Sequence, residues 1–158
     1  MKDIVLSIPF VPPTENKIKV IRVIRGRPGG LAYTKEATNY RKKFKQHVRD
    51  TYLIDIQNFV STHTDYSTYT VNFVFYFPKD ALVNKGWPKT KTYYKKMDVG
   101  NRRKLLEDCL SEVLGVDDSR FFSVKLTKRF LEDNTSEPYV SIRIWQYKDD
   151  TIWKEYNE

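Results

Sequence analysis

The stretch that decides the fold is KKMDVGNRRKLLEDCLSEVLGVDDSR, residues 95–120. Apolar side chains recur in it at helical spacing, at Leu106, Cys109, Leu110 and Val113. This spacing predicts an amphipathic helix over residues 101–114 with one buried face. Gly115 follows the last periodic residue, and helices often end at such a glycine because it adopts the left-handed conformation without strain.

The polar face of this predicted helix carries acids and a lysine. At about 100° per residue, four side chains fall within about 80° of one another, opposite the apolar face: Asn101, Lys104, Asp108 and Glu112. Asp98 precedes the helix by about one turn, and the pair Asp117 and Asp118 follows it. Three or four carboxylates could therefore converge near one lysine, and Mg²⁺ prefers oxygen ligands of this kind.

The same residues also have an ordinary structural interpretation. Asp98 or Asn101 is typical of a helix N-cap, and the sequence VDDS is typical of a turn. Lys104 and Asp108 could form an i,i+4 ion pair on a solvated face. Taken singly the residues leave both interpretations open, and only their joint arrangement favours a metal site.

The net charge is the second indication of function. The chain carries a formal charge of +8 and has a pI of about 9.4. Residues 17–50 hold eleven basic residues against two acidic ones. Solubility does not require such clustering, whereas a polyphosphate partner such as nucleic acid explains it. A merely solvated basic surface is the alternative.

Length and composition restrict the class of protein. We expect one domain over residues 1–158, in which residues from about 145 to 158 form a C-terminal tail. No apolar run approaches the roughly 18 residues that a membrane span needs. The single cysteine excludes an internal disulfide and a cysteine-built zinc site, so a cytoplasmic protein is expected.

Several segments predict β-strands because they are rich in β-branched and aromatic residues: residues 3–10, 69–77, 121–130 and 139–147. YTVNFVFYF, residues 69–77, gives the strongest indication. Residues 18–26 alternate apolar and basic side chains, which predicts a half-buried strand or one arm of a hairpin. GRPGG, residues 26–30, predicts a flexible loop.

A first helix is predicted over residues 34–53, with Thr34 as its N-cap. Its apolar side chains recur at helical spacing, and its other face is nearly all basic: Ala37, Tyr40, Phe44, Val48 and Tyr52 are the apolar positions. Residues 79–96 predict a long basic loop. The order of elements predicts a small α+β domain, in which a mixed or antiparallel sheet packs with two main helices.

In combination these motifs resemble the RusA-type Holliday-junction resolvases, a family common in phages and prophages. The family signature is Asp-x-Asp-Asn, a lysine one helical turn later, an aspartate after a further turn, and an Asp-Asp pair. The matching positions are Asp98, Gly100, Asn101, Lys104, Asp108, Asp117 and Asp118. PFVPPTENK resembles the opening of the family and aligns Asn16 with a recurrent asparagine, and VKLTKRF aligns Lys128 with a recurrent lysine.

The resemblance implies a Mg²⁺-dependent endodeoxyribonuclease, with Mn²⁺ as a possible substitute. Such an enzyme acts as a homodimer on four-way DNA junctions, where paired symmetric nicks serve recombination and repair of phage DNA in the host cytoplasm. The resemblance assigns Asp98 and Asp118 to the metal, with Asp117 beside them, and places Lys104 near the scissile phosphate. The remaining polar residues of the helix would support or compensate: Asp108, Glu112 and Asn101.

One position departs from the family signature, because Gly100 replaces its second aspartate. Asp117, Asp108 or Glu112 could take over as a metal ligand, since glycine leaves room for water and lets the backbone approach the ion. The enzyme could instead cut slowly. It could also bind branched DNA, or a host protein, without cutting. We expect nuclease activity, because the other positions of the signature remain.

Contacts to DNA are expected from the basic residues of two segments and from two positions that match the family: Lys17, Lys19, Arg22, Arg25 and Arg27; Lys89, Lys91, Lys95 and Lys96; and Asn16 and Lys128. Trp87, Tyr93 or Tyr94 could insert between unstacked bases at the crossover. Packing of their loop onto the domain is the alternative.

Overall fold

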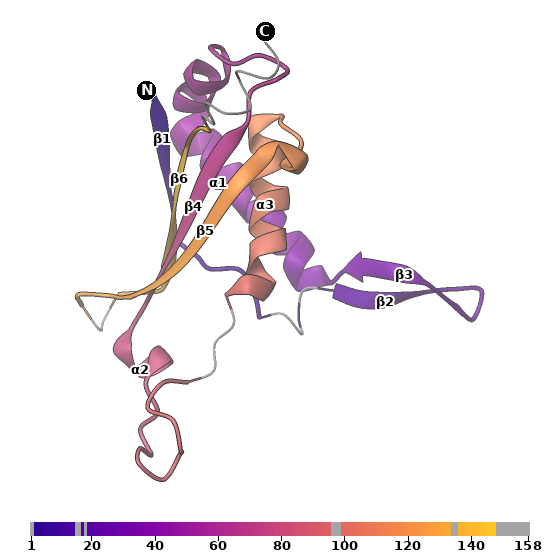
Figure 1. Cartoon of the computed structure of the whole chain (residues 1–158). Coiled ribbons are helices and arrows are strands. Elements are labelled where there is room, and N and C mark those ends of the chain that lie inside the picture. Colours follow the sequence, from indigo (N-terminus) through magenta and orange to yellow (C-terminus); the bar gives the residue numbers. More distant parts are fainter. Residues whose placement is uncertain (1, 15–16, 18, 96–98, 134–135, 148–158) are drawn as a thin grey trace, which may run out of the picture.

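The computed structural model describes the chain except residues 1, 15–16, 18, 96–98, 134–135 and 148–158, and it does not describe the side chains of residues 21–24, 28 and 101. Its body is one sheet with two long helices on one face, and a β-hairpin and a smaller excursion extend away from that body (Figure 1). Among the described residues, no helix combines the length and the hydropathy needed to cross a membrane.

The sheet contains β1 (Asp3–Ile8), β4 (Tyr69–Phe77), β5 (Phe121–Phe130) and β6 (Tyr139–Gln146), in the order β1-β6-β4-β5. β6 pairs antiparallel with both β1 and β4, while β4 and β5 run parallel. A parallel pair requires a crossover connection, which here includes a helix. The predicted α+β fold with a mixed sheet is therefore confirmed.

The core lies between this sheet and the two long helices. Along β4, every second residue is buried, as the period of two in a strand requires. Phe73 and Phe75 are fully buried in its centre, and Ile142 of β6 lies in register with Phe73. The buried aromatic side chains of residues 69–77 therefore fill the space between the sheet and the helices.

The first long helix, α1 (Lys35–Val60), begins as predicted and ends later. Thr34 is the N-cap, and its Oγ1 accepts a hydrogen bond of 3.2 Å from the Ala37 amide. The sequence predicts an end near residue 53, but Ile56 and Phe59 continue the buried face for two more turns. The additional burial of these two side chains favours the longer helix.

The second long helix, α3 (Gly100–Leu114), confirms the prediction over residues 101–114. Gly115 follows it in the left-handed conformation with φ 66°. Leu106, Cys109 and Leu110 are buried as predicted, whereas Val113 is only partly buried, and the buried face also includes Leu105 and Leu114. The helix therefore packs against α1 and the sheet with a broad apolar face, which leaves its polar face toward the outside.

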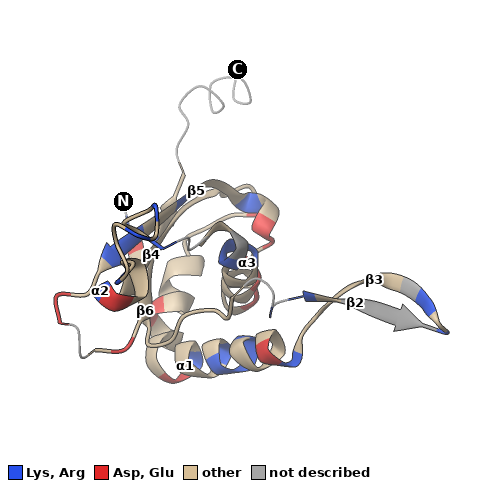
Figure 2. Cartoon of the chain, turned by 90° about the horizontal axis from the view of Figure 1, so that it is seen from below, with Lys and Arg blue, Asp and Glu red and all other residues tan. Residues whose placement is uncertain are grey.

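The segment after β1 differs from its predicted structure. Residues 26–30 are predicted to form a flexible loop, but β3 (Arg27–Tyr33) begins at Arg27 and pairs antiparallel with β2 (Lys19–Ile24). Arg25 and Gly26 both have positive φ, 51° and 76°, and such a two-residue turn matches the twist of a hairpin. The β2–β3 hairpin extends away from the body (Figures 1 and 2), and Val20 and Leu31 are exposed rather than half-buried.

The predicted loop over residues 79–96 is partly structured. It begins with the short helix α2 (Lys79–Leu82), and a β-bridge then joins Val83 to Tyr94. A 3₁₀ turn, η2 (Asp118–Arg120), lies between α3 and β5. These two connections and α3 itself make up the crossover between the parallel strands β4 and β5.

Cys109 provides a chemical test of the core. Its side chain is buried on α3, and burial raises the pKa of its thiol to about 12. We expect Ellman's reagent at pH 8 to leave the native protein unmodified, because the reactive thiolate is absent and the sulfur is covered. Protein unfolded in guanidinium should release one equivalent per chain, and rapid reaction of the native protein would contradict this packing.

Candidate functional site

Lys104 joins two carboxylates from different elements. Its Nζ lies 3.2 Å from Asp108 Oδ1, one turn further along α3, and donates a hydrogen bond to Asp118 Oδ2 at the start of η2. Gly115 turns the chain back at the end of α3, and Val116 is buried behind this turn. The structure therefore brings together one lysine and two acids of the predicted site.

Arg120 fixes the turn that carries Asp118. Its Nε donates to the carbonyl oxygen of Ser67 at 2.7 Å, and its Nη2 donates to that of Thr64 at 2.6 Å. Its guanidinium also lies 5.5 Å from the ring centroid of Tyr69. The role of Arg120 was not predictable from the sequence, because both carbonyl partners are more than 50 residues away and nothing local indicates them.

Tyr33 connects the β2–β3 hairpin to the same site. Its hydroxyl donates a hydrogen bond to Asp108 Oδ2, so Asp108 receives a donor on each carboxylate oxygen. Lys19 Nζ lies 5.5 Å and Arg41 Cζ 5.1 Å from the centroid of the Tyr33 ring. Tyr33 was also missed from the sequence, where it is simply the residue before the N-cap of α1.

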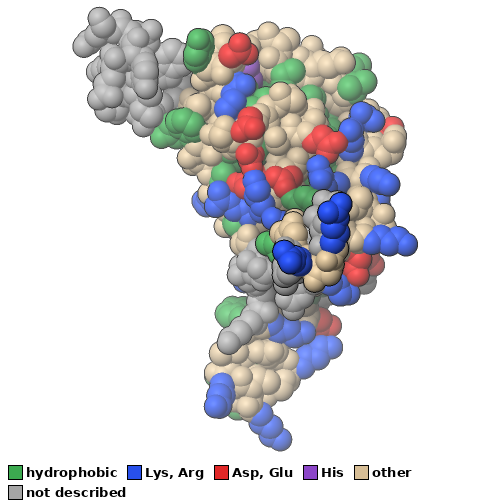
Figure 3. Space-filling view, turned by 90° about the vertical axis from the view of Figure 1, so that its right-hand side faces the viewer, with side chains coloured by type: hydrophobic (Ala, Val, Ile, Leu, Met, Phe, Trp, Pro, Cys, Tyr) green, Lys and Arg blue, Asp and Glu red, His purple; other side chains and the backbone are tan. Residues whose placement is uncertain are grey.

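The site is electronegative at its centre. Burial raises the pKa of the Asp108 carboxyl, the nearby Asp118 carboxylate raises it further, and Lys19 lowers it. Two acids thus share one direct lysine partner. Figure 3 shows this face of the molecule, on which acidic side chains gather above the hairpin among lysine and arginine side chains.

Glu112 and Asp117, two further candidates, make other contacts. Glu112 accepts from Lys45 Nζ at 2.7 Å and from Arg41 Nη2 at 3.4 Å, and these bonds from α1 lower the pKa of its carboxyl. The exposed Asp117 accepts from the Ser119 amide at 2.9 Å and caps η2, which lowers the pKa of its carboxyl. Within the part of the chain that the structure describes, no group of three His, Cys, Asp or Glu side chains could hold one ion.

Several predicted site residues are not among the residues that the structure describes. Asn16, Lys96 and Asp98 are outside the described residues, as are the side chains of Arg22 and Asn101. A set of three acidic ligands that includes Asp98 therefore remains a prediction. Gly100 is the first residue of α3, so the position at which the resemblance predicts an aspartate lies at the start of the helix.

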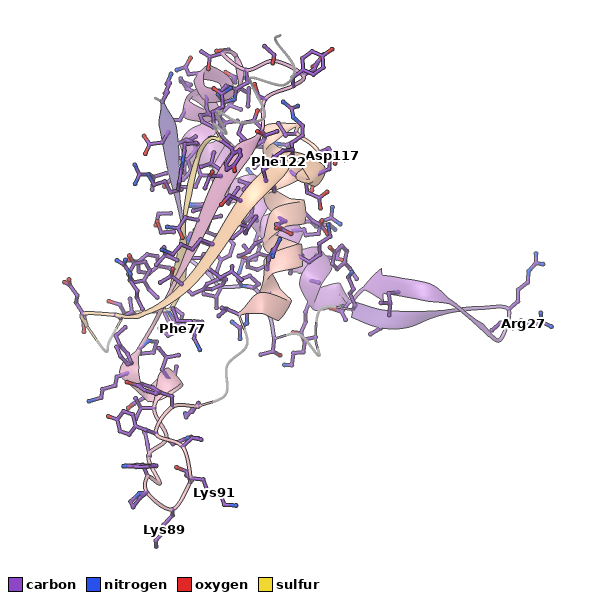
Figure 4. All side chains as sticks on the ribbon, in the orientation of Figure 1. Arg27, Phe77, Lys89, Lys91, Asp117 and Phe122 are labelled. Carbon is purple, nitrogen blue, oxygen red and sulfur yellow. The ribbon has the colours of Figure 1, made fainter. Side chains whose placement is uncertain are left out.

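The predicted DNA-binding residues lie on separate parts of the surface. Arg27 lies at the end of the hairpin, and Lys89 and Lys91 lie at the end of the excursion between α2 and α3 (Figure 4). Lys17 is exposed, and its Nζ lies 3.8 Å from Glu36 Oε1. Lys128 is exposed on β5. Further lysine and arginine residues lie along α1 (Figure 2). The predicted DNA-binding residues thus lie on the two protrusions, beside the start of α1 and on β5, and α1 adds further basic side chains.

Comparisons with solved structures return distant likenesses. A 2C-methyl-D-erythritol 2,4-cyclodiphosphate synthase from Plasmodium vivax has 11% identity and a TM-score of 0.32, over 92% of this chain and 97% of that chain. A Plasmodium falciparum structure, IspF in complex with CDP, has 8% identity and a TM-score of 0.33, over 90% of each chain. At these TM-scores neither structure informs fold or function.

The sequence itself identifies the family. No curated protein matches the chain. Residues 9–145 match the family described as endodeoxyribonuclease RusA, and this range includes the hairpin, α3, the acidic turn and most of β6. Because the match covers most of the 158 residues, the chain belongs to the RusA endodeoxyribonuclease family.

Proposed function

We propose that this protein resolves four-way DNA junctions by paired symmetric nicks, as a Mg²⁺-dependent homodimer of a phage recombination and repair system in the host cytoplasm. The observation that carries the proposal is the bonding of Lys104 to both Asp108 and Asp118. It places a cation and two acids of the family signature at one point, beside surfaces rich in lysine and arginine. Phosphodiester cleavage requires both kinds of group.

The residues present fit a hard divalent ion. Asp108 and Asp118 offer carboxylate oxygens, and two acids against one bonded lysine leave negative charge that a cation would offset. We propose that Asp118 and Asp98 hold the ion and that Asp108 compensates for the aspartate missing at position 100. When bound, Mg²⁺ or Mn²⁺ would polarise a phosphoryl oxygen and acidify a water molecule.

Lys104 would then act on the scissile phosphate. Its side chain is about half exposed, and the contacts that hold it here are the two carboxylates. With Asp108 and Asp118 engaged by a bound divalent ion, the Lys104 ammonium group would be free to offset the charge that develops on the phosphate or on the leaving oxygen. The proposed role of Lys104 is therefore electrostatic stabilisation, close to the reacting atoms.

The homodimer follows from the symmetry of the substrate. A four-way junction has approximate two-fold symmetry, and a C2 dimer presents two equivalent sites to it. The hairpin, α1 and the excursion before α3 would hold the phosphate backbone through their basic side chains. Each phosphate neutralised contributes about −0.9 to the slope of log affinity against log salt, so a flat salt response would contradict DNA binding of any kind.

Gly100 supports a second candidate function. The structure begins α3 at this residue, and a glycine supplies no carboxylate at the position where the family has one. A protein without that charge could bind branched DNA and fail to cut it. Its role would then be to recognise or protect junctions, or to engage a host protein.

Cleavage of a labelled four-way junction, beside a linear duplex of the same sequence, tests the proposal. Paired nicks in Mg²⁺ or Mn²⁺ that disappear with EDTA are expected. The variant Gly100→Asp restores the missing family acid and should raise the rate. Junction binding without cutting by the wild-type protein, with activity only in Gly100→Asp, would support the binding function instead. Equal affinity for junction and duplex would contradict both the nuclease function and the junction-binding function.

Tyr33→Phe tests the connection between hairpin and site. The change removes the hydroxyl that donates to Asp108 but keeps the ring between Lys19 and Arg41. We expect the single-turnover cleavage rate to fall about three- to tenfold, as the loss of one hydrogen bond predicts, with junction affinity unchanged. An unchanged rate, or a loss of affinity that accounts for the whole effect, would remove Tyr33 from the site.

A further inference from the structure

The excursion between α2 and α3 is a closed finger, which we define as residues 83–95. Its base is closed by the β-bridge between Val83 and Tyr94 and by hydrogen bonds of 2.8 Å from Asn84 N to Tyr93 O and from Lys95 N to Leu82 O. It extends from the end of the sheet, away from the helices that form the core (Figure 1). The finger is therefore not needed to complete the hydrophobic core.

One side chain organises the interior of the finger. Asn84 Nδ2 donates to the carbonyl oxygens of Thr92, at 2.8 Å, and Tyr94, at 3.2 Å, and lies 3.2 Å from Thr92 Oγ1. Thr90 Oγ1 donates to Thr92 O at 2.9 Å. These bonds replace the sheet and helix partners that the backbone lacks here. A segment arranged in this way loses little conformational entropy when it binds a ligand.

Three aromatic rings gather on this organised segment. Trp87, Tyr93 and Tyr94 are 49%, 41% and 58% exposed. Their rings meet edge to face, with centroids 6.2 Å apart for Trp87 and Tyr93 and 4.9 Å apart for Tyr93 and Tyr94. The rings therefore do not pack onto the body of the domain, and their faces form an apolar surface that water contacts.

The charge around these rings has one sign. Residues 81–97 contain lysines and no aspartate or glutamate. Lys85 lies 3.5 Å from Asp80 Oδ2 and Lys95 donates to the Asp80 carbonyl at 2.7 Å, so both are held near the base. Lys89 and Lys91 extend from the end of the finger (Figure 4). Aromatic faces beside lysines match a ligand that alternates flat rings with phosphates.

We infer that the finger binds unpaired bases of a DNA strand, with its rings stacked on the bases and Lys89 and Lys91 against the adjacent phosphates. A base presents its face to a protein only when it is unstacked, so the finger should discriminate against continuous duplex. A polyanion suits this surface, because residues 81–97 present lysines and no aspartate or glutamate. The inference rests on the proposed function only for the place of those bases, the branch point of a junction.

Fluorescence anisotropy in EDTA tests the inference without cleavage. The ligands are a labelled single strand, the duplex of the same sequence and a four-way junction, and the variants are Trp87→Ala and Tyr94→Ala. Tyr66→Ala is the matched control, since Tyr66 is an aromatic residue 86% exposed in the turn before β4. We expect each finger variant to lose about tenfold in affinity for the single strand, as removal of one stacking partner predicts. The duplex affinity and the control should be unchanged.

A junction with 2-aminopurine at its branch point reports whether the finger binds there. The wild-type protein should change its fluorescence, and Tyr94→Ala should reduce that change. Equal circular dichroism and equal Ellman protection of Cys109 in all variants ensure that the fold is intact. Finger variants that bind the single strand as the wild type does, or that alter sedimentation instead of DNA binding, would overturn the inference.

The outcomes also separate this inference from the proposed function. If the protein cuts junctions normally with either finger variant and their single-strand affinity is unchanged, the finger inference fails and the nuclease stands. If the wild-type protein neither prefers nor cuts junctions but binds single strands through the finger, the inference stands and the proposed function fails.

Discussion

Asp118→Asn is expected to abolish junction cleavage while junction binding persists. The amide has the shape of the carboxylate and can still accept a hydrogen bond from Lys104, so the turn η2 should be preserved. It lacks the negative charge that a divalent ion requires, and the rate should fall by about 1000-fold. Single-turnover cleavage in Mg²⁺ and anisotropy in EDTA measure the two properties separately.

The neighbouring acid supplies the matched control. Asp117 accepts a hydrogen bond from the Ser119 amide, and an asparagine can make the same cap. Asp117→Asn should therefore reduce cleavage by much less than Asp118→Asn. If both variants are equally inactive, Asp117 is itself a metal ligand. If Asp118→Asn retains activity, the assignment of Asp118 is wrong.

Phe73→Ala should produce the largest loss of stability. Phe73 is fully buried at the centre of β4, in register with Leu126 on one side and Ile142 on the other. Its truncation removes a large apolar side chain and leaves a cavity, which should lower the free energy of unfolding by about 3–5 kcal/mol. Urea denaturation followed by circular dichroism measures this as a lower midpoint with an unchanged slope.

The adjacent residue tests whether burial is the cause. Val74 lies on the opposite, half-buried face of β4. Val74→Ala should lower the free energy of unfolding by about 1 kcal/mol, which is the typical effect of a single substitution. Equal losses for Phe73→Ala and Val74→Ala would mean that the core does not lie on the face that the alternation of β4 indicates.

Elements with a strong local pattern were predictable from the sequence. The β-branched and aromatic residues 69–77 form β4, the apolar spacing around Leu106 and Leu110 corresponds to α3, and Gly115 ends that helix. The position of Lys104 and Asp108 on one helical face likewise follows from their spacing of four residues. Periodicity contains this information because it states directly which face of an element is buried.

Features that depend on distant partners were not predictable in this way. The β2–β3 hairpin was missed in part because Arg25 has a positive φ, which a side chain other than glycine rarely adopts. Tyr33 and Arg120 reach the site through bonds to residues at least 53 positions away. No single-sequence pattern shows such a contact, since it arises only when sheet and helices are assembled.

β6 is the last described element of the chain, yet it lies inside the sheet between β1 and β4. During synthesis on the ribosome, β1 and β4 therefore emerge long before the strand that joins them. Unpaired strands of this kind expose backbone groups that can pair with other chains. The nascent protein should need protection from aggregation until residues 139–146 have left the exit tunnel. The face of α3 and η2 that carries Lys104, Asp108 and Asp118 should assemble only after translation has passed that point.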